Sequence, residues 1–161
     1  MAHLFILEMN PHTYSRLLYN LYSNIFPIPT VLNQAVGPAN ETIELNSGNG
    51  NTGQSLLWAS PEQTDFSVRM RTINDLVSEY FPEGRIDVAK IDIEGSEHSI
   101  FAGNDWDALK RCRYIIMEIH EVPESDRTDI VSVLKDAQFD LLMTADPENP
   151  GVFCFANRTE P

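Results

Sequence analysis

The fold is decided by residues 90–97, which read KIDIEGSE and follow a run of apolar residues. Two carboxylates stand at the end of this run, and a glycine and the start of a helix come next. In open α/β sheets ligands bind beyond the carboxyl ends of the strands, so acids at such an end lie where a small molecule would bind. Asp92 and Glu94 are therefore the first candidate site residues. We expect Gly95 to permit a tight turn and Ser96 to cap the helix that follows.

The same eight residues also fit an ordinary strand-to-helix corner, in which the acids only favour the helix dipole. The surrounding residues favour a buried strand, because Val88, Ala89, Ile91 and Ile93 form a near-continuous apolar run. Such a run is typical of a strand that is buried on both faces. We therefore expect a central strand here, not an edge strand.

Length and charge limit the classes of protein that fit this chain. Its 161 residues, 42% of them hydrophobic, fit a single compact domain over residues 1–161. Eleven basic and 24 acidic residues give a formal charge of −13, which disfavours binding to nucleic acid and to anionic membranes. No apolar run approaches the roughly 20 residues that cross a membrane. Cys112 and Cys154 lie in or beside apolar stretches, so we expect free core thiols in a reducing cytoplasm.

The rest of the chain alternates between strand and helix patterns. An apolar strand at residues 4–7 ends at Glu8, with Asn10 as the helix cap and Pro11 at the first helical position. Further strands are expected at residues 30–36, 42–45, 88–93, 114–119, 139–143 and 152–156, and helices at 14–25, 73–80, 97–103 and 130–137. This order predicts a mostly parallel three-layer α/β sheet that ends in an antiparallel hairpin.

A glycine-rich segment at residues 48–53 spells the G-x-G-x-x-G pattern of dinucleotide sites. That pattern binds a cofactor only between a strand and a helix start, and here the chain soon reaches Pro61. The segment better fits a flexible loop over the substrate, with Trp58 as an apolar wall.

Four segments, taken together, resemble the FkbM family of S-adenosylmethionine-dependent methyltransferases. They are residues 8–11, 34–37, 90–97 and 116–120, which read EMNP, QAVG, KIDIEGSE and IMEIH. Their order and spacing are more specific than any one motif, and they span nearly the whole chain. The resemblance implies a Rossmann-like class I methyltransferase fold, S-adenosylmethionine as the cofactor and a small molecule as the methyl acceptor.

The resemblance also implies roles for individual residues. Glu8 would bind the ribose hydroxyls of the methyl donor, since one carboxylate can accept both. Alternatively, Glu8 only favours the N-terminus of the next helix. The adenine would lie near residues 34–36, and the reacting centre near Asp92 and Glu94. The implied cofactor-binding residues are Glu8, Asn10, Gln34, Ala35, Val36 and Asp92.

One departure from the family concerns the start of the chain, which resembles the second strand of these methyltransferases. The first β-α unit, with the glycine-rich turn that cradles the methionine part of the cofactor, is missing. Since its strand is normally central, two neighbours would keep unpaired backbone edges unless they close up or recruit a second copy of the chain. A fragment, a shortened gene product and a rearranged sheet all fit this expectation.

The expected chemistry is methylation of an oxygen on a small-molecule or sugar-like acceptor. Methyl transfer is an in-line displacement, so the protein mainly positions the reactants and removes a proton. The candidate bases are Asp92, Glu94 and His120, and His120 has the best intrinsic basicity near neutral pH. His120 could equally be a polar residue that ends a strand, with Glu118 beside it.

Two other functions also fit the sequence. A noncatalytic methyltransferase remnant could pair its open sheet with a partner, which the missing glycine turn favours. A metal-dependent enzyme could use carboxylate and imidazole ligands near the strand ends, although none of them shows a strong zinc or calcium spacing. Those residues are Asp92, Glu94, Glu97, His98, Glu118 and His120.

Overall fold

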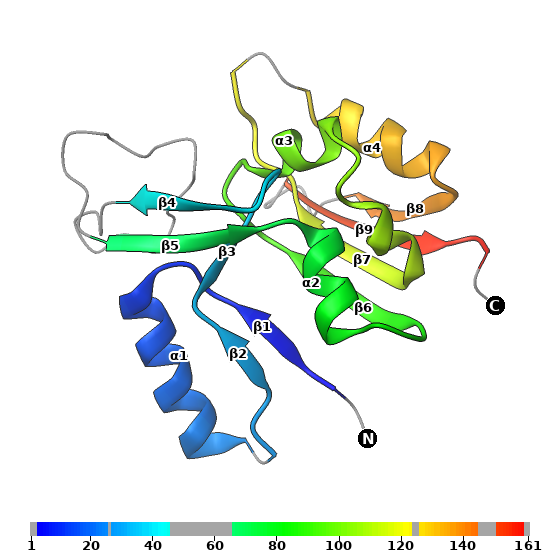
Figure 1. The fold of residues 1–161 in the computed structure, drawn as a ribbon. Coiled ribbons are helices and arrows are strands. Elements are labelled where there is room, and N and C mark those ends of the chain that lie inside the picture. Colours follow the sequence, from blue (N-terminus) through cyan, green and yellow to red (C-terminus); the bar gives the residue numbers. More distant parts are fainter. Residues whose placement is uncertain (1–2, 26, 46–65, 124–125, 145–150, 160–161) are drawn as a thin grey trace.

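The computed structural model describes residues 3–25, 27–45, 66–123, 126–144 and 151–159 (Figure 1). The glycine-rich segment at 48–53 and Trp58 lie outside the described residues, and so does most of the turn expected between the last two strands. The described chain contains both strands and helices, as the sequence predicts, and they alternate from residue 73 to residue 144. Between residues 30 and 71, however, four strands follow one another with no helix among the described residues. The fold is therefore a mixed α/β fold.

The helices and strands have the following bounds. The helices are α1 (Pro11–Asn24), α2 (Ile73–Tyr80), α3 (Glu97–Ala102) and α4 (Arg127–Asp136), with a short 3₁₀ helix at Asp107–Arg111. The strands are β1 (Phe5–Leu7), β2 (Thr30–Leu32), β3 (Gln34–Val36), β4 (Glu41–Leu45), β5 (Phe66–Arg71), β6 (Ile86–Ile91), β7 (Cys112–Glu118), β8 (Phe139–Thr144) and β9 (Val152–Asn157). β5 was not expected, although its alternation of half-buried or buried and exposed residues is the period-2 signal of a strand.

The described strands form three hydrogen-bonded ladders. β1 pairs with β2, the second ladder has the order β3-β5-β4, and the third has the order β6-β7-β9-β8. Parallel pairs join β1 to β2, β3 to β5 and β6 to β7, whereas the other three pairs are antiparallel. One continuous, mostly parallel sheet is thus not seen among these strands. The C-terminal hairpin of β8 and β9 is present, with a register shift between Leu141 and Met143.

β6 is an edge strand of its ladder, so the expectation of a central strand was wrong. Within the described chain β6 pairs only with β7, and β1 pairs only with β2. The apolar run of β6 misled the prediction because Val88 is 52% exposed. Among the described strands, β1 and β6 therefore each carry an unpaired backbone edge.

The largest apolar core lies on β7 and β9 and is covered by three helices. Ile115 and Met117 of β7 and Phe155 of β9 have no exposed surface. Side chains of α2, α3 and α4 pack into the same cluster, among them Val77 and Leu134. Full burial of such a side chain contributes about 1.5–3 kcal/mol, so this core fixes the strand ends that carry the site.

The two cysteines are free, as expected. Cys112 begins β7 and has no exposed surface. Burial raises the pKa of the Cys112 thiol to about 12. The thiol is therefore protonated at neutral pH and acts as a small apolar core residue.

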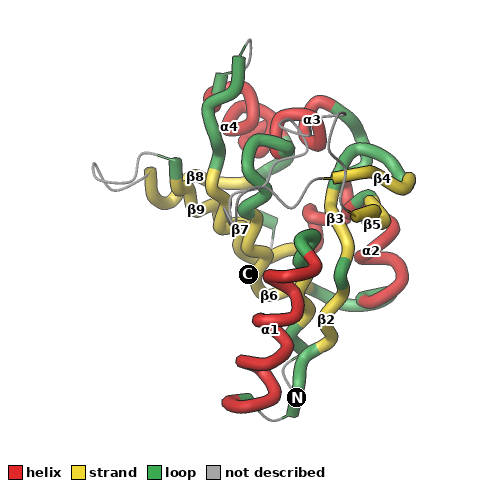
Figure 2. The backbone as a smooth tube through the Cα atoms, turned by 90° about the vertical axis from the view of Figure 1, so that its left-hand side faces the viewer, coloured by secondary structure: helices red, strands yellow, loops and turns green. Residues whose placement is uncertain are grey.

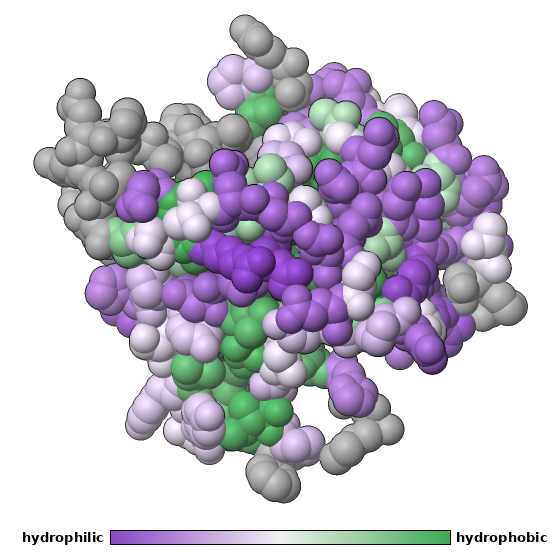
Figure 3. All heavy atoms as spheres, in the orientation of Figure 1, coloured by the Kyte–Doolittle hydropathy of each residue, from purple (hydrophilic) through white to green (hydrophobic). Residues whose placement is uncertain are grey.

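α1 and the ladder of β1 and β2 extend away from the rest of the molecule (Figures 1 and 2). Asn10 caps α1 as predicted, because its side chain accepts hydrogen bonds from the backbone N–H groups of His12 and Thr13. The apolar stripe of α1 is only partly covered: Leu21 is buried, whereas Tyr22 is 67% exposed. Apolar side chains also gather on this part of the surface in Figure 3. None of the helices in the described ranges is both long and apolar enough to span a membrane.

Candidate functional site

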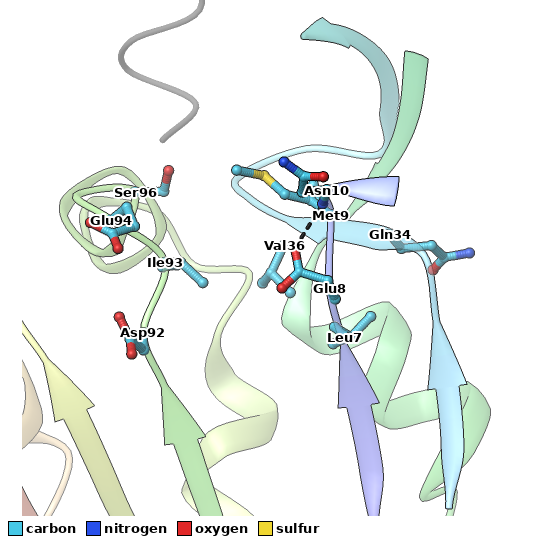
Figure 4. A pocket seen from close by; sticks show the side chains of 11 residues that line it. Leu7, Glu8, Met9, Asn10, Gln34, Val36, Asp92, Ile93, Glu94 and Ser96 are labelled. Carbon is cyan, nitrogen blue, oxygen red and sulfur yellow. Dashed lines mark hydrogen bonds between the residues drawn. The ribbon is translucent and has the colours of Figure 1, made fainter. Parts of the chain in front are cut away.

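A pocket lies between the end of β1, strand β3 and the turn that follows β6 (Figure 4). Its volume is about 210 Å³. Pockets that enclose a drug-sized ligand usually measure about 300–1,000 Å³, so this one would enclose part of such a ligand. It is lined by Leu7, Glu8, Met9, Asn10, Gln34, Ala35, Val36, Asp92, Ile93, Glu94 and Ser96.

All six residues expected to bind the cofactor line this pocket, and so does Glu94. They come from segments up to 84 residues apart, between Glu8 and Asp92. The structure thus brings the predicted residues together, while their roles stay predictions. Sequence reasoning missed Leu7, Met9 and Ile93 as lining residues, because an apolar residue beside a strand end carries no signal that separates a pocket wall from core.

Glu8 lies where β1 ends, in a loop held by the neighbouring strand. Its backbone N–H donates to the carbonyl of Leu32 at 3.1 Å. The side-chain amide of Asn33 donates to the carbonyls of Glu8 and Met9, at 2.8 and 2.9 Å. These bonds fix the backbone at the end of β1 and so fix the direction of the Glu8 side chain.

The Glu8 carboxylate accepts a hydrogen bond from the backbone N–H of Asn10, with 2.7 Å between nitrogen and Oε1. Burial raises the pKa of the Glu8 carboxyl, and backbone hydrogen bonds from Asn10 and Met9 oppose that rise. A carboxylate offers about four acceptor sites. Two N–H groups leave capacity for further donors, so the local role and a ligand role are compatible.

β3 forms the wall of the pocket opposite the turn after β6. Ala35 is buried at 3% exposure and pairs in register with Met70 of β5. Gln34 Oε1 is buried and has no hydrogen-bond partner in the described structure. Gln34 lines the pocket, and in Figure 4 its side chain points away from Glu8.

The turn after β6 contains two residues with left-handed backbone angles, Glu94 at φ 56° and Gly95 at φ 98°. Gly95 adopts this conformation without strain, as expected, whereas a residue with a Cβ atom is strained there by about 1–3 kcal/mol. The strained Glu94 backbone directs its carboxylate toward His120, with 3.3 Å between Oε2 and Nε2. Backbone strain of this kind is concentrated at functional sites.

Ser96 does not cap α3 with its side chain, so that prediction was wrong. Its backbone has φ −70° and ψ −9°, which is helical, whereas a capping side chain needs an extended backbone at that position. The Ser96 hydroxyl is instead buried without a hydrogen-bond partner in the described part of the chain, and the residue lines the pocket.

His120 follows β7 and is surrounded by three carboxylates. Its Nε2 lies 3.3 Å from Glu94 Oε2 and 3.8 Å from Glu118 Oε1, and its Nδ1 lies 3.3 Å from Glu97 Oε1. Glu97 has no exposed surface and also accepts a hydrogen bond from the backbone N–H of Ile93 at 3.0 Å. Glu97 therefore orients the imidazole ring through its Nδ1 atom. The sequence did not predict this orienting role, because it shows Glu97 only as an acid in the first turn of a helix.

Asp92 lies at the end of β6 and forms an ion pair with Lys90, with 2.8 Å between Nζ and Oδ2. Asp92, Glu118 and His120 each offer a ligand atom, and these three atoms lie within 4.8 Å of one another. His98 does not belong to this group. Its Nε2 makes a 2.8 Å hydrogen bond to the carbonyl of His120. We refer to Asp92, Glu94, Glu97, Glu118 and His120 as the strand-end cluster.

Comparison with known proteins gives an independent result. The family model of the methyltransferase FkbM domain matches residues 2–141. The methyltransferase sdnD of Sordaria araneosa is 32% identical to the chain over 81 residues, which cover 46% of this chain and 31% of that protein. The match thus spans about a third of the length of this relative. No solved structure matches the chain.

Proposed function

Because the chain belongs to the FkbM methyltransferase family, we propose that it transfers a methyl group from S-adenosylmethionine to an oxygen of a small-molecule or sugar-like acceptor. One observation carries the proposal: a single pocket gathers acids from the ends of two strands, Glu8 after β1 and Asp92 after β6. Strand ends of this kind are where open α/β folds bind nucleotide-like ligands. The three ladders would then be parts of one Rossmann-like layer between helices.

The Glu8 side of the pocket suits the nucleoside half of the cofactor. Glu8 would accept the two ribose hydroxyls with the acceptor capacity that its backbone hydrogen bonds leave free. Donation from these hydroxyls would also offset the burial that now disfavours the charged carboxylate. The adenine would lie along residues Gln34, Ala35 and Val36, with Asn10 holding the loop that carries Glu8.

The strand-end cluster suits the removal of a proton from the acceptor. The cofactor, when bound, supplies an activated sulfonium methyl group, so the acceptor oxygen attacks while its proton leaves. If the Nδ1–H of His120 donates to Glu97, the Nε2 atom is an acceptor. His120 itself does not line the pocket, but its Nε2 lies 3.3 Å from Glu94, which does. Asp92 and Glu94 lie on the same rim and are the alternative bases.

The test is a single-turnover assay with S-adenosylmethionine and a panel of sugar and small hydroxyl acceptors, in which S-adenosylhomocysteine is measured by mass spectrometry. We expect acceptor-dependent formation of S-adenosylhomocysteine, and the methylated product fixes the acceptor atom. Methylation at nitrogen or carbon would overturn the assignment to oxygen. A folded chain that binds the cofactor but transfers no methyl group to any acceptor would favour the noncatalytic alternative.

The noncatalytic alternative, an assembly module, is favoured by one observation. β1 and β6 each end a ladder among the described strands, and Val88 of β6 is exposed. Unpaired edges of this kind can bind a strand from a second copy of the chain. Light scattering on wild type and Val88→Lys would show a dimer that the substitution disrupts; a monomer in both would exclude pairing through β6.

A further inference from the structure

Ligand atoms from the ends of two adjacent parallel strands converge in the strand-end cluster. Asp92 follows β6, Glu118 ends β7 and His120 follows it, so the pairing of these strands brings the three side chains together. Their ligand atoms lie within 4.8 Å of one another. Atoms bound to one metal ion at about 2.0–2.2 Å lie about 3–4.4 Å apart, so a small closure of these side chains would complete a site.

The carboxylates of the strand-end cluster carry more negative charge than the neighbouring side chains can neutralise. Glu94, Glu97 and Glu118 all face the same imidazole ring of His120. Three negative charges against at most one positive charge leave an excess of two. Asp92 adds a fourth carboxylate, which is met by Lys90. An imidazolium alone therefore leaves an excess of two negative charges, whereas a divalent cation bound to the neutral imidazole would reduce that excess to one.

A second and independent observation concerns Glu97, which is entirely buried behind His120. One of its oxygens faces His120 Nδ1 at 3.3 Å, and the other, Oε2, is buried without a hydrogen-bond partner in the part of the chain that the structure describes. A buried carboxylate with an unsatisfied oxygen is costly unless a positive charge lies close by. A histidine whose rear nitrogen donates to a carboxylate is also the usual arrangement behind a metal ion.

We propose that Asp92, Glu118 and His120 bind a divalent metal ion through two carboxylates and Nε2, with Glu97 as a positioning residue behind the imidazole. Two oxygen ligands and one nitrogen ligand suit Mn²⁺ or Zn²⁺ better than an all-oxygen site for Ca²⁺. Glu94, whose carboxylate lies 3.3 Å from the same nitrogen, is the nearest further ligand. His98 is not among the residues whose ligand atoms lie within 4.8 Å of one another.

The ion would lie at the rim of the proposed methyl-transfer pocket, because Asp92 is both a proposed ligand and a residue that lines the pocket. There it would hold the acceptor oxygen and lower the pKa of the acceptor hydroxyl. This role in catalysis rests on the proposed function. The binding of the ion does not, so it is measured with the metal alone.

The test is a Mn²⁺ titration of the purified chain, followed by the electron paramagnetic resonance signal of free Mn²⁺, with a parallel Zn²⁺ titration followed by thermal melting. We expect one saturable ion per chain and a higher melting temperature, since a ligand that binds only the native state stabilises it. Glu118→Gln and Asp92→Asn should weaken binding at least about tenfold, and Glu97→Gln roughly 10- to 100-fold. Glu121→Gln and Asp87→Asn, exposed acids on the same two segments, should bind like wild type.

Absence of saturable binding of either ion to the folded wild type, or equal binding by the ligand variants and the controls, would overturn the proposal and leave an imidazolium. If Glu118→Gln does not fold, as judged by circular dichroism, the metal affinity of Asp92→Asn is the deciding measurement, because Asp92 is partly exposed. Ion binding without binding of S-adenosylmethionine would retain this site and reject the proposed function. Binding of S-adenosylmethionine without binding of either ion would retain the proposed function and reject the metal site.

Discussion

The two sides of the pocket are held together in different ways. On the side of β1, the Glu8 carboxylate is fixed by the backbone N–H of Asn10, two residues away. On the side of β6 and β7, His120 is fixed by Glu94 and Glu97, which lie 26 and 23 residues away in the chain. On the first side a local hydrogen bond holds the Glu8 carboxylate, and Leu32 and Asn33 hold the backbone. On the second side both contacts of the imidazole ring come from the segment after β6, so they depend on the pairing of β6 with β7. Substitutions should therefore affect binding on the first side and chemistry on the second.

The largest expected effect is on the β6 side. Asp92→Asn should lower methyl transfer by roughly 10²–10⁴-fold, because it removes a carboxylate that serves as base or holds the acceptor, while the fold is retained. The measurement is single-turnover transfer alongside circular dichroism. Asp87→Asn is the control, because Asp87 is an exposed acid on the same strand. Full turnover by Asp92→Asn would remove Asp92 from the reaction.

A smaller loss is expected from Glu97→Gln, which keeps an oxygen for the Nδ1–H of His120 but removes the buried charge. Activity should fall roughly 10- to 100-fold, as for other residues that orient a functional histidine. A purely structural role would lower thermal stability without changing the pH profile. The positioning role instead predicts a shifted pH profile and, in a double-mutant cycle with His120→Gln, a coupling energy of about 0.5–3 kcal/mol.

On the β1 side, Glu8→Gln should weaken the binding of S-adenosylmethionine by about 1.5–3 kcal/mol, the value of hydrogen bonds to a charged group.

Folding raises the pKa of the Glu8 carboxyl, so its contribution to stability is present below its unfolded pKa and is lost as pH rises through its folded pKa. At neutral pH, Glu8→Gln should therefore be at least as stable as wild type. Weaker binding of S-adenosylmethionine by Glu8→Gln, with an unchanged melting temperature, would show that Glu8 contributes to binding and not to the stability of the core. Glu44→Gln on β4 is an exposed control.

The pH dependence of cofactor binding should also distinguish the two sides. Ribose hydroxyls donate to the charged form of Glu8, so affinity should fall as pH decreases through the raised pKa of that carboxyl. Calorimetry at stepped acidic pH measures this, and Glu8→Gln should remove the dependence. An unchanged slope in Glu8→Gln would assign the dependence to another acid, such as Asp92.

The smallest effect is expected from Ser96→Ala, compared with Asn10→Ala. The Ser96 hydroxyl is buried and unpartnered, so its removal should leave stability unchanged or raise it by up to about 1 kcal/mol. Asn10 caps α1 with its side chain, so its removal should cost about 0.5–2 kcal/mol. Urea unfolding measures both. A larger loss for Ser96→Ala than for Asn10→Ala would mean that the hydroxyl has a partner in the native state.

The local parts of this molecule were predictable from the sequence. The cap at Asn10, Pro11 at the first helical position and the turn at Gly95 each depend on neighbouring residues, and the structure has all three. The position of β6 at an edge was not predictable from its apolar run, because such a run indicates burial of the two faces and not which strands pair along the two edges. The contact of Glu97 with His120 also required the pairing of β6 with β7. The family of the chain, in contrast, was readable from the order of its short segments.

The central claim is that the pocket between β1 and β6 binds S-adenosylmethionine through Glu8. Isothermal titration of wild type, Glu8→Gln and Glu44→Gln with S-adenosylmethionine tests it most directly. The account predicts micromolar binding, about −8 kcal/mol, for wild type and Glu44→Gln, and binding weakened at least about tenfold for Glu8→Gln. Equal binding by all three proteins, or no binding by a folded wild type, would contradict it.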